Sequence, residues 1–171
     1  MKSNLINIIV RTASSLIILF ICVLEFTNGQ DFIINNFKVQ DGLSQNQPWT
    51  ISQDSSGFLW IGTRKGLNRF DGQNFLKYYK NSNSAINDNI VVDIEIDNLN
   101  RIWVASEFGF YGLNVGMNGK IITDFGAYLK DKQMFDLDIY NNQLFVCTDN
   151  GLFQYKLTLN GPELINQYLS E

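Results

Sequence analysis

The sequence repeats itself every 42 or 43 residues, and this period constrains the fold more than any other feature. Three segments align, beginning at Thr50, Asp93 and Asp136. In each, an aromatic residue, a small residue, a hydroxyl residue and a glycine follow in the same order. These aligned residues are Trp60, Gly62, Thr63 and Gly66, then Trp103, Ala105, Ser106 and Gly109, then Phe145, Cys147, Thr148 and Gly151. A unit of this length accommodates four short strands and their turns.

The pattern within each unit predicts those strands. A first strand is expected at 49–53, 92–96 and 135–139, and an almost entirely apolar second strand at 59–63, 102–106 and 144–148. The shared glycine opens a third strand, and Asp71-Gly72 and Asn160-Gly161 mark turns into a fourth. Repeated four-stranded sheets are typical of a β-propeller. We therefore predict an all-β fold, a partial β-propeller of three blades with four antiparallel strands each.

The aligned polar and small positions have structural interpretations. Asp54 and Asp97 fall in the turn after the first strand, where a carboxylate caps the turn, and Gly57 lies in the same turn. A small residue at 62, 105 and 147 permits close approach of neighbouring sheets, and the next hydroxyl can hydrogen-bond the loop before the glycine. Cys147 is expected to be a small buried residue and not a reactive thiol.

The first thirty residues differ from the repeats. Lys2 and Arg11 precede an apolar run at 14–24, which is too short to cross about 30 Å of hydrocarbon as a helix. Followed by the small residues Thr27 and Gly29, this run predicts a secretory signal that is cleaved after Gly29. An uncleaved membrane anchor is the alternative. We expect a periplasmic or secreted protein.

Composition restricts the chemistry available to the chain. It has 13 basic and 17 acidic residues, which argues against a nucleic-acid surface. It has no histidine, the commonest general base and metal ligand. No metal-ligand cluster or nucleophile constellation is recognisable, so we expect no enzymatic activity, no metal and no cofactor. If Cys22 leaves with the signal, Cys147 cannot form an intrachain disulfide, and stability must come from the core.

A catalytic alternative rests on a near match to the Asp-box of sialidase propellers. The matching residues are Ser52, Asp54, Gly57 and Trp60, with one extra residue after the aspartate. That box is itself a structural turn, and a glycosidase needs two placed carboxylates, which sequence alone cannot pair. A glycan hydrolase or lyase is therefore only a remote alternative.

Two binding alternatives involve other residues. Calcium could be held by Asp93, Glu95 and Asp97, although the flanking glycine loop of a dedicated site is absent. Trp49 and Phe108 lie at predicted strand ends, where propeller loops gather ligands, and could stack on sugar rings. Packing between blades is the favoured interpretation of both aromatics.

The first repeat resembles the two-component regulator propeller repeat. Its marks are DGLS at 41–44 and QDSSGFLWIGTRKGLNRFDG at 53–72. The second repeat is looser, with Val104-Ala105-Ser106 in place of Ile-Gly-Thr, and the third is degenerate, with Phe145 for Trp and Tyr140 for Asp.

That resemblance implies the periplasmic sensor region of a hybrid histidine kinase, which commonly binds carbohydrate fragments and signals across the membrane. Such proteins continue through further blades, a transmembrane helix and a kinase core, so the chain is expected to be an N-terminal fragment of one. A free-standing secreted binding propeller is the alternative.

The expected organisation is a signal peptide at 1–29, an N-terminal strand at 30–43 that could close a ring, and blades at 44–86, 87–129 and 130–171. Closed propellers have about four to eight blades, so three should leave open faces. The expected partners are further blades, in the same or another chain, and an oligosaccharide. We expect no nucleic acid, and membrane contact only through a missing C-terminal region or an uncleaved signal.

Overall fold

The computed structural model describes residues 34–80, 86 and 88–169. The chain divides into two compact units, Met1–Asn36 and Phe37–Glu171, and the second contains every strand described below. The predicted signal peptide lies outside the described residues. Within the described ranges, no helix has the length and apolar character needed to cross a bilayer.

The described strands form three consecutive blades after a short 3-10 helix, η1 (Val39–Asp41). The first blade contains β1 (Pro48–Gln53), β2 (Leu59–Thr63), β3 (Gly66–Phe70) and β4 (Phe75–Tyr78). The second contains β5 (Val91–Ile96), β6 (Ile102–Ser106), β7 (Phe108–Val115) and the first part of β8 (Ile121–Tyr140). The third contains the rest of β8, then β9 (Gln143–Thr148), β10 (Gly151–Thr158) and β11 (Gly161–Leu169). The predicted all-β partial propeller is confirmed.

The second and third blades share one strand, which the sequence did not predict. All pairings are antiparallel, but β5 to β11 form a single seven-stranded sheet because β8 pairs with β7 first and with β9 later. The expected boundary between these blades, after residue 129, falls inside β8. The strand changes direction near it, where Gly126 and Leu129 have positive φ angles of 80° and 50°.

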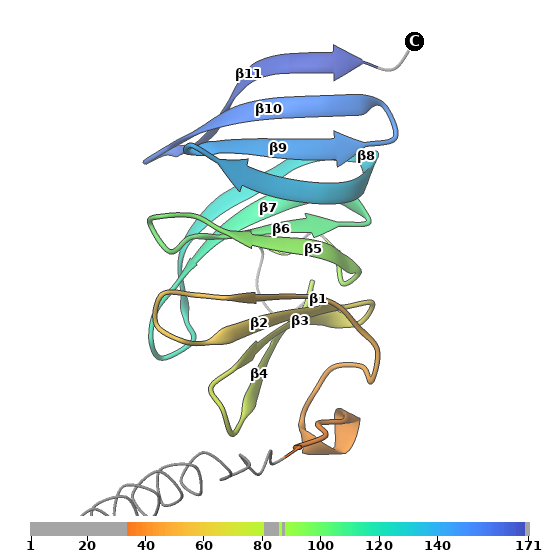
Figure 1. Cartoon of the computed structure of the whole chain (residues 1–171), viewed down its shortest axis with the longest axis vertical. Coiled ribbons are helices and arrows are strands. Elements are labelled where there is room, and N and C mark those ends of the chain that lie inside the picture. Colours follow the sequence, from red (N-terminus) through yellow and green to blue (C-terminus); the bar gives the residue numbers. More distant parts are fainter. Residues whose placement is uncertain (1–33, 81–85, 87, 170–171) are drawn as a thin grey trace, which may run out of the picture. The chain divides into compact units, whose positions relative to one another are not determined.

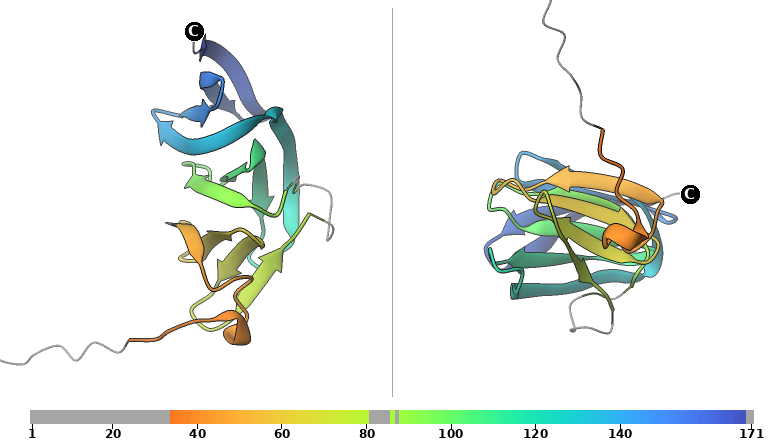
Figure 2. Two further views of the ribbon diagram at one scale, coloured as in Figure 1. Left: turned by 90° about the vertical axis from the view of Figure 1, so that its right-hand side faces the viewer. Right: turned by 90° about the horizontal axis from the view of Figure 1, so that it is seen from below.

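The blades stack face to face, with β1 and β5 along one side of the stack and β4 and the first part of β8 along the other (Figures 1 and 2). We call the face that carries Trp60, Trp103 or Phe145 the forward face of its blade, and the opposite face the rear face. The forward face of the first blade packs on the rear face of the second, and Trp60 is fully buried there. The second blade packs on the third in the same way, with Trp103 fully buried.

Asp54 stabilises the first turn and also accepts a hydrogen bond from the indole N–H of the buried tryptophan. Its Oδ1 accepts hydrogen bonds from the Ser56 and Phe58 N–H groups at 2.9 and 3.0 Å. Its Oδ2 accepts one from the Trp60 indole N–H at 2.9 Å. The expected turn-capping role is confirmed, and the indole bond explains why an aspartate accompanies a tryptophan six residues later.

The second repeat has the same arrangement, whereas the third repeat has neither the aspartate nor the tryptophan. Asp97 accepts the Trp103 indole N–H at 3.0 Å. In the third repeat, Phe145 has no indole N–H and Tyr140 has no carboxylate, so donor and acceptor are absent together. A two-residue turn replaces the capped loop, with positive φ at Asn141 and Asn142.

The aligned hydroxyls and glycines behave as predicted. The three hydroxyls donate hydrogen bonds across the turn before the third strand, over 2.7–3.1 Å, from Thr63 to the Gly66 carbonyl, from Ser106 to the Gly109 carbonyl and from Thr148 to the Gly151 carbonyl. All three glycines have positive φ. Gly62 also permits close blade approach, because an added Cβ would lie 2.4 Å from a Val91 methyl group.

Cys147 differs from its expected burial. It lies on the forward face of the third blade, which nothing in the described structure covers, and it is only partly buried. Desolvation, together with the nearby Asp136 and Asp138, raises the pKa of its thiol. A raised pKa disfavours the thiolate, which is the nucleophilic form of cysteine.

Two buried arginines join the blades, and the sequence did not identify them. The Arg69 guanidinium, 3.4 Å from the Phe58 ring centroid, donates to the carbonyls of Gly116 and Met117 in the β7–β8 turn, both at 3.1 Å. Arg101, in the second blade, donates to the Thr158 carbonyl in the third. Each blade interface thus has one arginine that reaches the last hairpin of the following blade.

The DGLS segment packs against the first blade. Gly42 has a φ of 111°, which allows the chain to turn so that Leu43 is buried. The Ser44 hydroxyl shares a 2.7 Å hydrogen bond with the Thr63 hydroxyl. The described part of the expected ring-closing segment contains no strand, and its role in closure remains a prediction.

Candidate functional site

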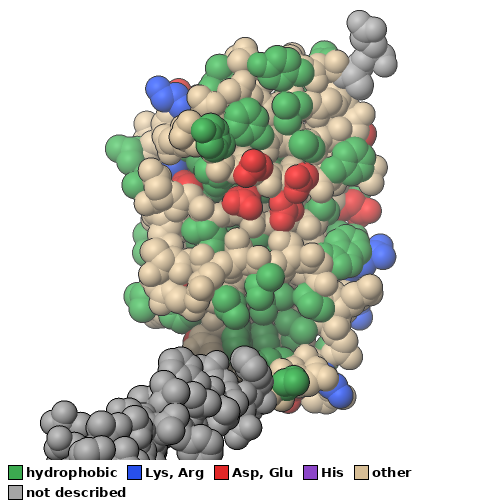
Figure 3. Space-filling model, in the orientation of Figure 1, with side chains coloured by type: hydrophobic (Ala, Val, Ile, Leu, Met, Phe, Trp, Pro, Cys, Tyr) green, Lys and Arg blue, Asp and Glu red, His purple; other side chains and the backbone are tan. Residues whose placement is uncertain are grey.

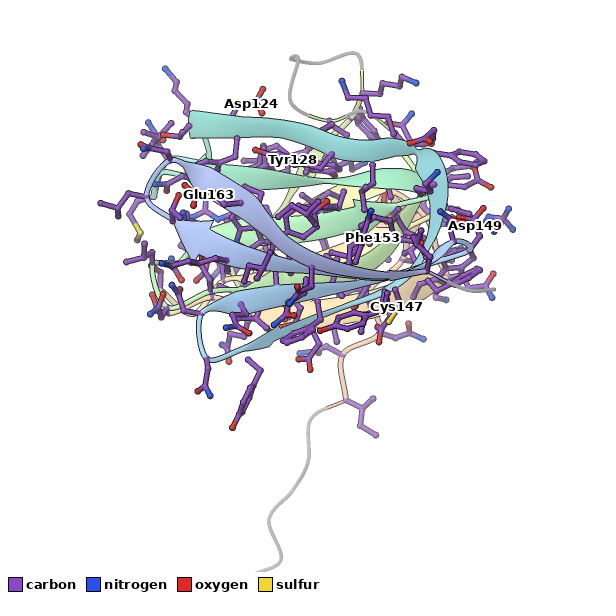
Figure 4. The ribbon with its side chains drawn as sticks, turned by 90° about the horizontal axis from the view of Figure 1, so that it is seen from above. Asp124, Tyr128, Cys147, Asp149, Phe153 and Glu163 are labelled. Carbon is purple, nitrogen blue, oxygen red and sulfur yellow. The ribbon has the colours of Figure 1, made fainter. Side chains whose placement is uncertain are left out.

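One end of the blades collects the turns before the third strands and the starts of the first strands. These meet because Pro48 pairs with Thr63, Val91 with Ser106 and Met134 with Thr148. We call this end the rim, and its residues of interest are Trp49, Arg64, Phe108, Phe135 and Asp149. Figure 4 shows Asp149 at this end of the third blade and Glu163 at the opposite end.

A β-bulge recurs at the rim in every blade. The pairing of the first and second strands skips one residue, which is Trp49, Val92 and Phe135 in turn. A bulge re-aims the side chain that it leaves unpaired and often lies beside a functional site. Here it places two large aromatic side chains, Trp49 and Phe135, at the rim, where both are exposed.

Trp49 and Phe108 are the aromatics that the sequence indicated as weak ligand candidates. Their exposed fractions are 45% and 48%, so about half of each side chain is accessible to a ligand. The Arg64 guanidinium lies 5.2 Å from the Trp49 ring centroid, within cation–π range. Exposed aromatic rings beside polar groups are the kind of surface that recognises amphipathic ligands such as sugars.

Acidic side chains gather where the first strands of successive blades lie side by side (Figure 3). Asp93 and Glu95 alternate along β5, and Asp136 and Asp138 alternate along β8. Asp93 accepts hydrogen bonds from the Thr50 hydroxyl in the first blade at 2.9 Å and from the Leu137 N–H in the third at 3.0 Å. This carboxylate therefore links three blades.

Crowding of these acids changes their protonation. Desolvation and the charges of Asp93, Asp138 and Asp136 raise the pKa of Glu95 to about 7. Desolvation and a hydrogen bond with the Asp93 carboxyl group raise the pKa of Asp136. Sequence reasoning did not pair these acids, although the 43-residue separation between Asp93 and Asp136 was visible in the repeat alignment.

The calcium site suggested by Asp93, Glu95 and Asp97 does not form. Asp97 turns away into its own loop, where its Oδ2 accepts from Arg101 Nε at 2.6 Å and from the Trp103 indole. No group of three or more histidine, cysteine, aspartate or glutamate side chains in the described part of the chain is arranged to hold a metal ion.

The rear face of the first blade carries an apolar hollow of about 410 Å³. Its lining includes Ile51, Leu59, Ile61, Phe70 and Phe75, together with Trp49 from the rim. Figure 3 shows the corresponding apolar patch over the lowest blade. Polar atoms are nearly absent from this surface, so it is suited to packing and not to polar recognition.

Comparison with known proteins finds a family match within the first blade and its N-terminal flank. Residues 42–65 match the family model of the two component regulator propeller. The chain is 43% identical over 63 residues to Histidine kinase P4 of Formosa agariphila, a match that covers 37% of this chain and 4% of that protein. The matched segment contains the last three residues of DGLS, together with Asp54, Trp60 and Thr63, whose contacts are described above.

Two solved structures illustrate the fold. The extracellular domain of a hybrid two component system from B. thetaiotaomicron superposes with a TM-score of 0.64 at 24% identity, over 80% of this chain and 20% of that one. Virginiamycin B lyase from Staphylococcus aureus superposes with a TM-score of 0.51 at 15% identity, over 71% of this chain and 41% of that one. The fold therefore occurs both in sensors and in an enzyme, and function must be argued from the site.

This chain spans a small part of the relatives it matches, a fifth of the sensor domain and less of the kinase. Within that part, the family match and the repeated Asp-to-Trp turn coincide in the first blade. Residues 42–65 thus resemble a two component regulator propeller repeat, and the described chain is a partial β-propeller with the same fold as part of the extracellular domain of that hybrid two component system.

Proposed function

We propose that this chain is a non-catalytic, ligand-binding propeller module of a periplasmic two-component sensor and that its ligand is carbohydrate-like. The observation that carries the proposal is the rim, where bulges and turns leave Trp49, Phe108 and Phe135 about half exposed and the Arg64 guanidinium lies 5.2 Å from the Trp49 ring centroid. A bulge at the same position in three blades is a reproducible way to place side chains at one end of a propeller. The ligand would lie across the rim, with its apolar faces on the aromatic rings.

Binding tests the proposal directly. The exported chain, purified without truncation, would be titrated with a panel of neutral and acidic oligosaccharides by calorimetry. We expect one class to bind, and we expect Trp49→Ala and Phe108→Ala each to weaken it at least tenfold. Tyr140→Ala is the matched control, because Tyr140 is an exposed aromatic at the opposite end of its strand. Binding that is absent for the whole panel, or equally affected by the control, would contradict the proposal.

The absence of catalysis needs its own measurement, because Glu95 is an acid of raised pKa within a carboxylate cluster. We expect oligosaccharides to be recovered unchanged after long incubation with the chain. Cleavage that is retained in Tyr140→Ala and abolished in Glu95→Gln would show instead that the cluster is a hydrolase or lyase centre.

The alternative is a free-standing binding propeller with no signalling partner. A kinase domain encoded in the same or the adjacent reading frame distinguishes the two functions. We expect such a domain, and ligand addition should then change its autophosphorylation. Its absence would favour the free-standing protein while leaving the binding result unaffected.

A further inference from the structure

We propose that a hollow between the first and second blades binds a small zwitterion, a free amino acid with an apolar side chain. The hollow lies at the end of the blades opposite the rim, where the β3–β4 turn of the first blade meets the β7–β8 turn of the second. Both blades that form it lie within the described residues. The inference does not depend on the ligand proposed for the rim.

The hollow is small and mixed in chemistry. Its volume is about 290 Å³, at the lower limit of the range of about 300–1,000 Å³ that is usual for ligand pockets, so it suits a ligand of few atoms. Its lining includes one cation, one anion, two amides and two flexible apolar side chains, which are Arg69, Asp71, Asn74, Asn118, Leu76 and Met117.

Arg69 is a buried cation with no carboxylate partner in the described part of the chain. It is 5% exposed, and its Nη1 and Nη2 donate to the carbonyls of Gly116 and Met117 at 3.1 Å. Its Nε has no acceptor among the described residues. The other interface arginine, Arg101, pairs its Nε with Asp97 at 2.6 Å. Because a buried charge is normally paired, Arg69 lacks the carboxylate that Arg101 has.

Asp71 supplies the opposite charge to the same hollow. Its Oδ1 accepts hydrogen bonds from the N–H groups of Asn74 and Gln73 at 2.6 and 2.8 Å. These bonds lower the pKa of Asp71, so its carboxylate is ionised at neutral pH. Its Oδ2 has a long contact of 3.5 Å with the Asn74 amide and is therefore available to a stronger donor. Among the described residues, Asp71 and Arg69 do not form an ion pair.

A hollow that contains both charges selects a ligand that carries both. A simple anion at Arg69 would be repelled by Asp71, and a simple cation at Asp71 would be repelled by Arg69. In a free amino acid, the carboxylate would accept from the Arg69 guanidinium and the ammonium would donate to Asp71 Oδ2. The exposed side chains of Leu76 and Met117 would then contact an apolar side chain of the ligand.

Calorimetric titration of the purified full chain with L-leucine and two analogues tests the need for both charges. Leucinamide lacks the carboxylate, and 4-methylpentanoate lacks the ammonium group. We expect leucine to bind at one site and each analogue to bind at least tenfold more weakly, because each loses one charge-assisted hydrogen bond. An analogue that binds as tightly as leucine would overturn the proposal, as would no binding of leucine, methionine or phenylalanine.

Substitution of Asp71 tests the site, and it leaves Arg69, which joins the blades, in place. Asp71→Asn keeps an oxygen that can accept from the turn but removes the charge, so leucine should bind at least tenfold more weakly. Asp124→Asn is the matched control, because Asp124 is also exposed and its Oδ1 accepts the Gly126 N–H at 2.8 Å. Equal binding losses in the two variants would contradict the proposed role of Asp71.

Methyl resonances of the methionines locate the ligand. Met117 lines the hollow, whereas Met134 is buried between the second and third blades. In carbon-13 methyl spectra, leucine should shift the Met117 resonance and leave that of Met134 unchanged. Met117→Leu assigns the first resonance. Leucine binding that leaves Met117 unshifted would show that the ligand occupies another site, and the proposal would be wrong.

Discussion

At the scale of single residues, the fold depends on pairs that are chemically complementary. Asp54 joins a turn to the Trp60 indole, and Asp97 joins another to Trp103. Each carboxylate accepts hydrogen bonds from backbone N–H groups and from a buried indole, and Asp97 also accepts one from Arg101. Loss of either the aspartate or the tryptophan therefore leaves a buried polar group without its bond. The third repeat avoids this cost because both partners are replaced.

We predict that Trp60→Ala destabilises the chain by about 3–5 kcal/mol, since it empties a fully buried site and leaves the Asp54 carboxylate without the indole donor. Urea unfolding followed by circular dichroism measures the free energy of unfolding. Trp49→Ala is the control, because half-exposed Trp49 should change stability far less. A midpoint equal to that of the unsubstituted chain would refute the importance of the buried indole.

The raised pKa of Glu95 predicts how the stability of the chain depends on pH. Its raised pKa means that the folded chain favours the protonated carboxyl group, so this contribution to stability is complete below the ordinary value of 4.5 and is lost as pH rises through about 7. Glu95→Gln should therefore stabilise the chain by about 1 kcal/mol at pH 8. The difference between variant and parent should nearly vanish at pH 4.

Denaturant midpoints at several pH values provide that comparison. Glu163→Gln is a suitable control, since Glu163 lies at the opposite end of the third blade (Figure 4). A Glu95→Gln stabilisation that is the same at pH 4 and pH 8 would show that repulsion within the acidic cluster is not its cause.

At the scale of elements, the contacts that hold one blade to the next come mainly from apolar faces, with one arginine at each interface. Arg69 lies in β3 and donates to two carbonyls of the β7–β8 turn. Arg101 instead lies in the turn between β5 and β6 and donates to the Thr158 carbonyl at the end of β10. Because the two arginines occupy different aligned positions, alignment of the repeats hides their common role.

We predict that Arg69→Met destabilises the chain by about 1–3 kcal/mol, because the Gly116 and Met117 carbonyls lose their donors. Hydrogen exchange should rise specifically in the β7–β8 turn. Arg64→Met, which removes an exposed arginine at the rim, should leave exchange in that turn unchanged. Equal protection of the turn in both variants would contradict the proposed link between the blades.

At the scale of the whole molecule, three stacked blades leave one face of the first and one face of the third without a neighbour in the described structure. The apolar hollow on the first blade is the consequence. Exposed apolar surface of this kind is typical of a face that another part of a protein covers.

The N-terminal segment makes the remaining prediction. We expect export with cleavage after Gly29, because a short apolar run is followed by the small residues Thr27 and Gly29. Mass spectrometry of the periplasmic fraction would detect a mature chain that begins at Gln30. A periplasmic or membrane-bound product that still begins at Met1 would contradict cleavage.

The sequence by itself determined the repeated sheet pattern and the local role of the repeat residues, but not the strand β8 that the second and third blades share. The second strands at 59–63 and 102–106 were predicted with the observed bounds, since an unbroken apolar run between turn residues has one local solution. The turns capped by Asp54 and Asp97 could also be predicted from the sequence, because the hydrogen-bond partners of each aspartate lie within six residues of it along the chain.

Only the tertiary structure decided what depends on neighbouring blades. The acidic cluster, the interface arginines and the uncovered rear face each involve residues far apart in sequence, whose proximity depends on how the sheets stack. The half-exposed positions of Trp49 and Phe108 likewise depend on how the strands pair and stack. Ile51 and Ile94 make the point most directly: the same side chain at the same aligned position is exposed in one blade and buried in the next, because only the second has a blade against it.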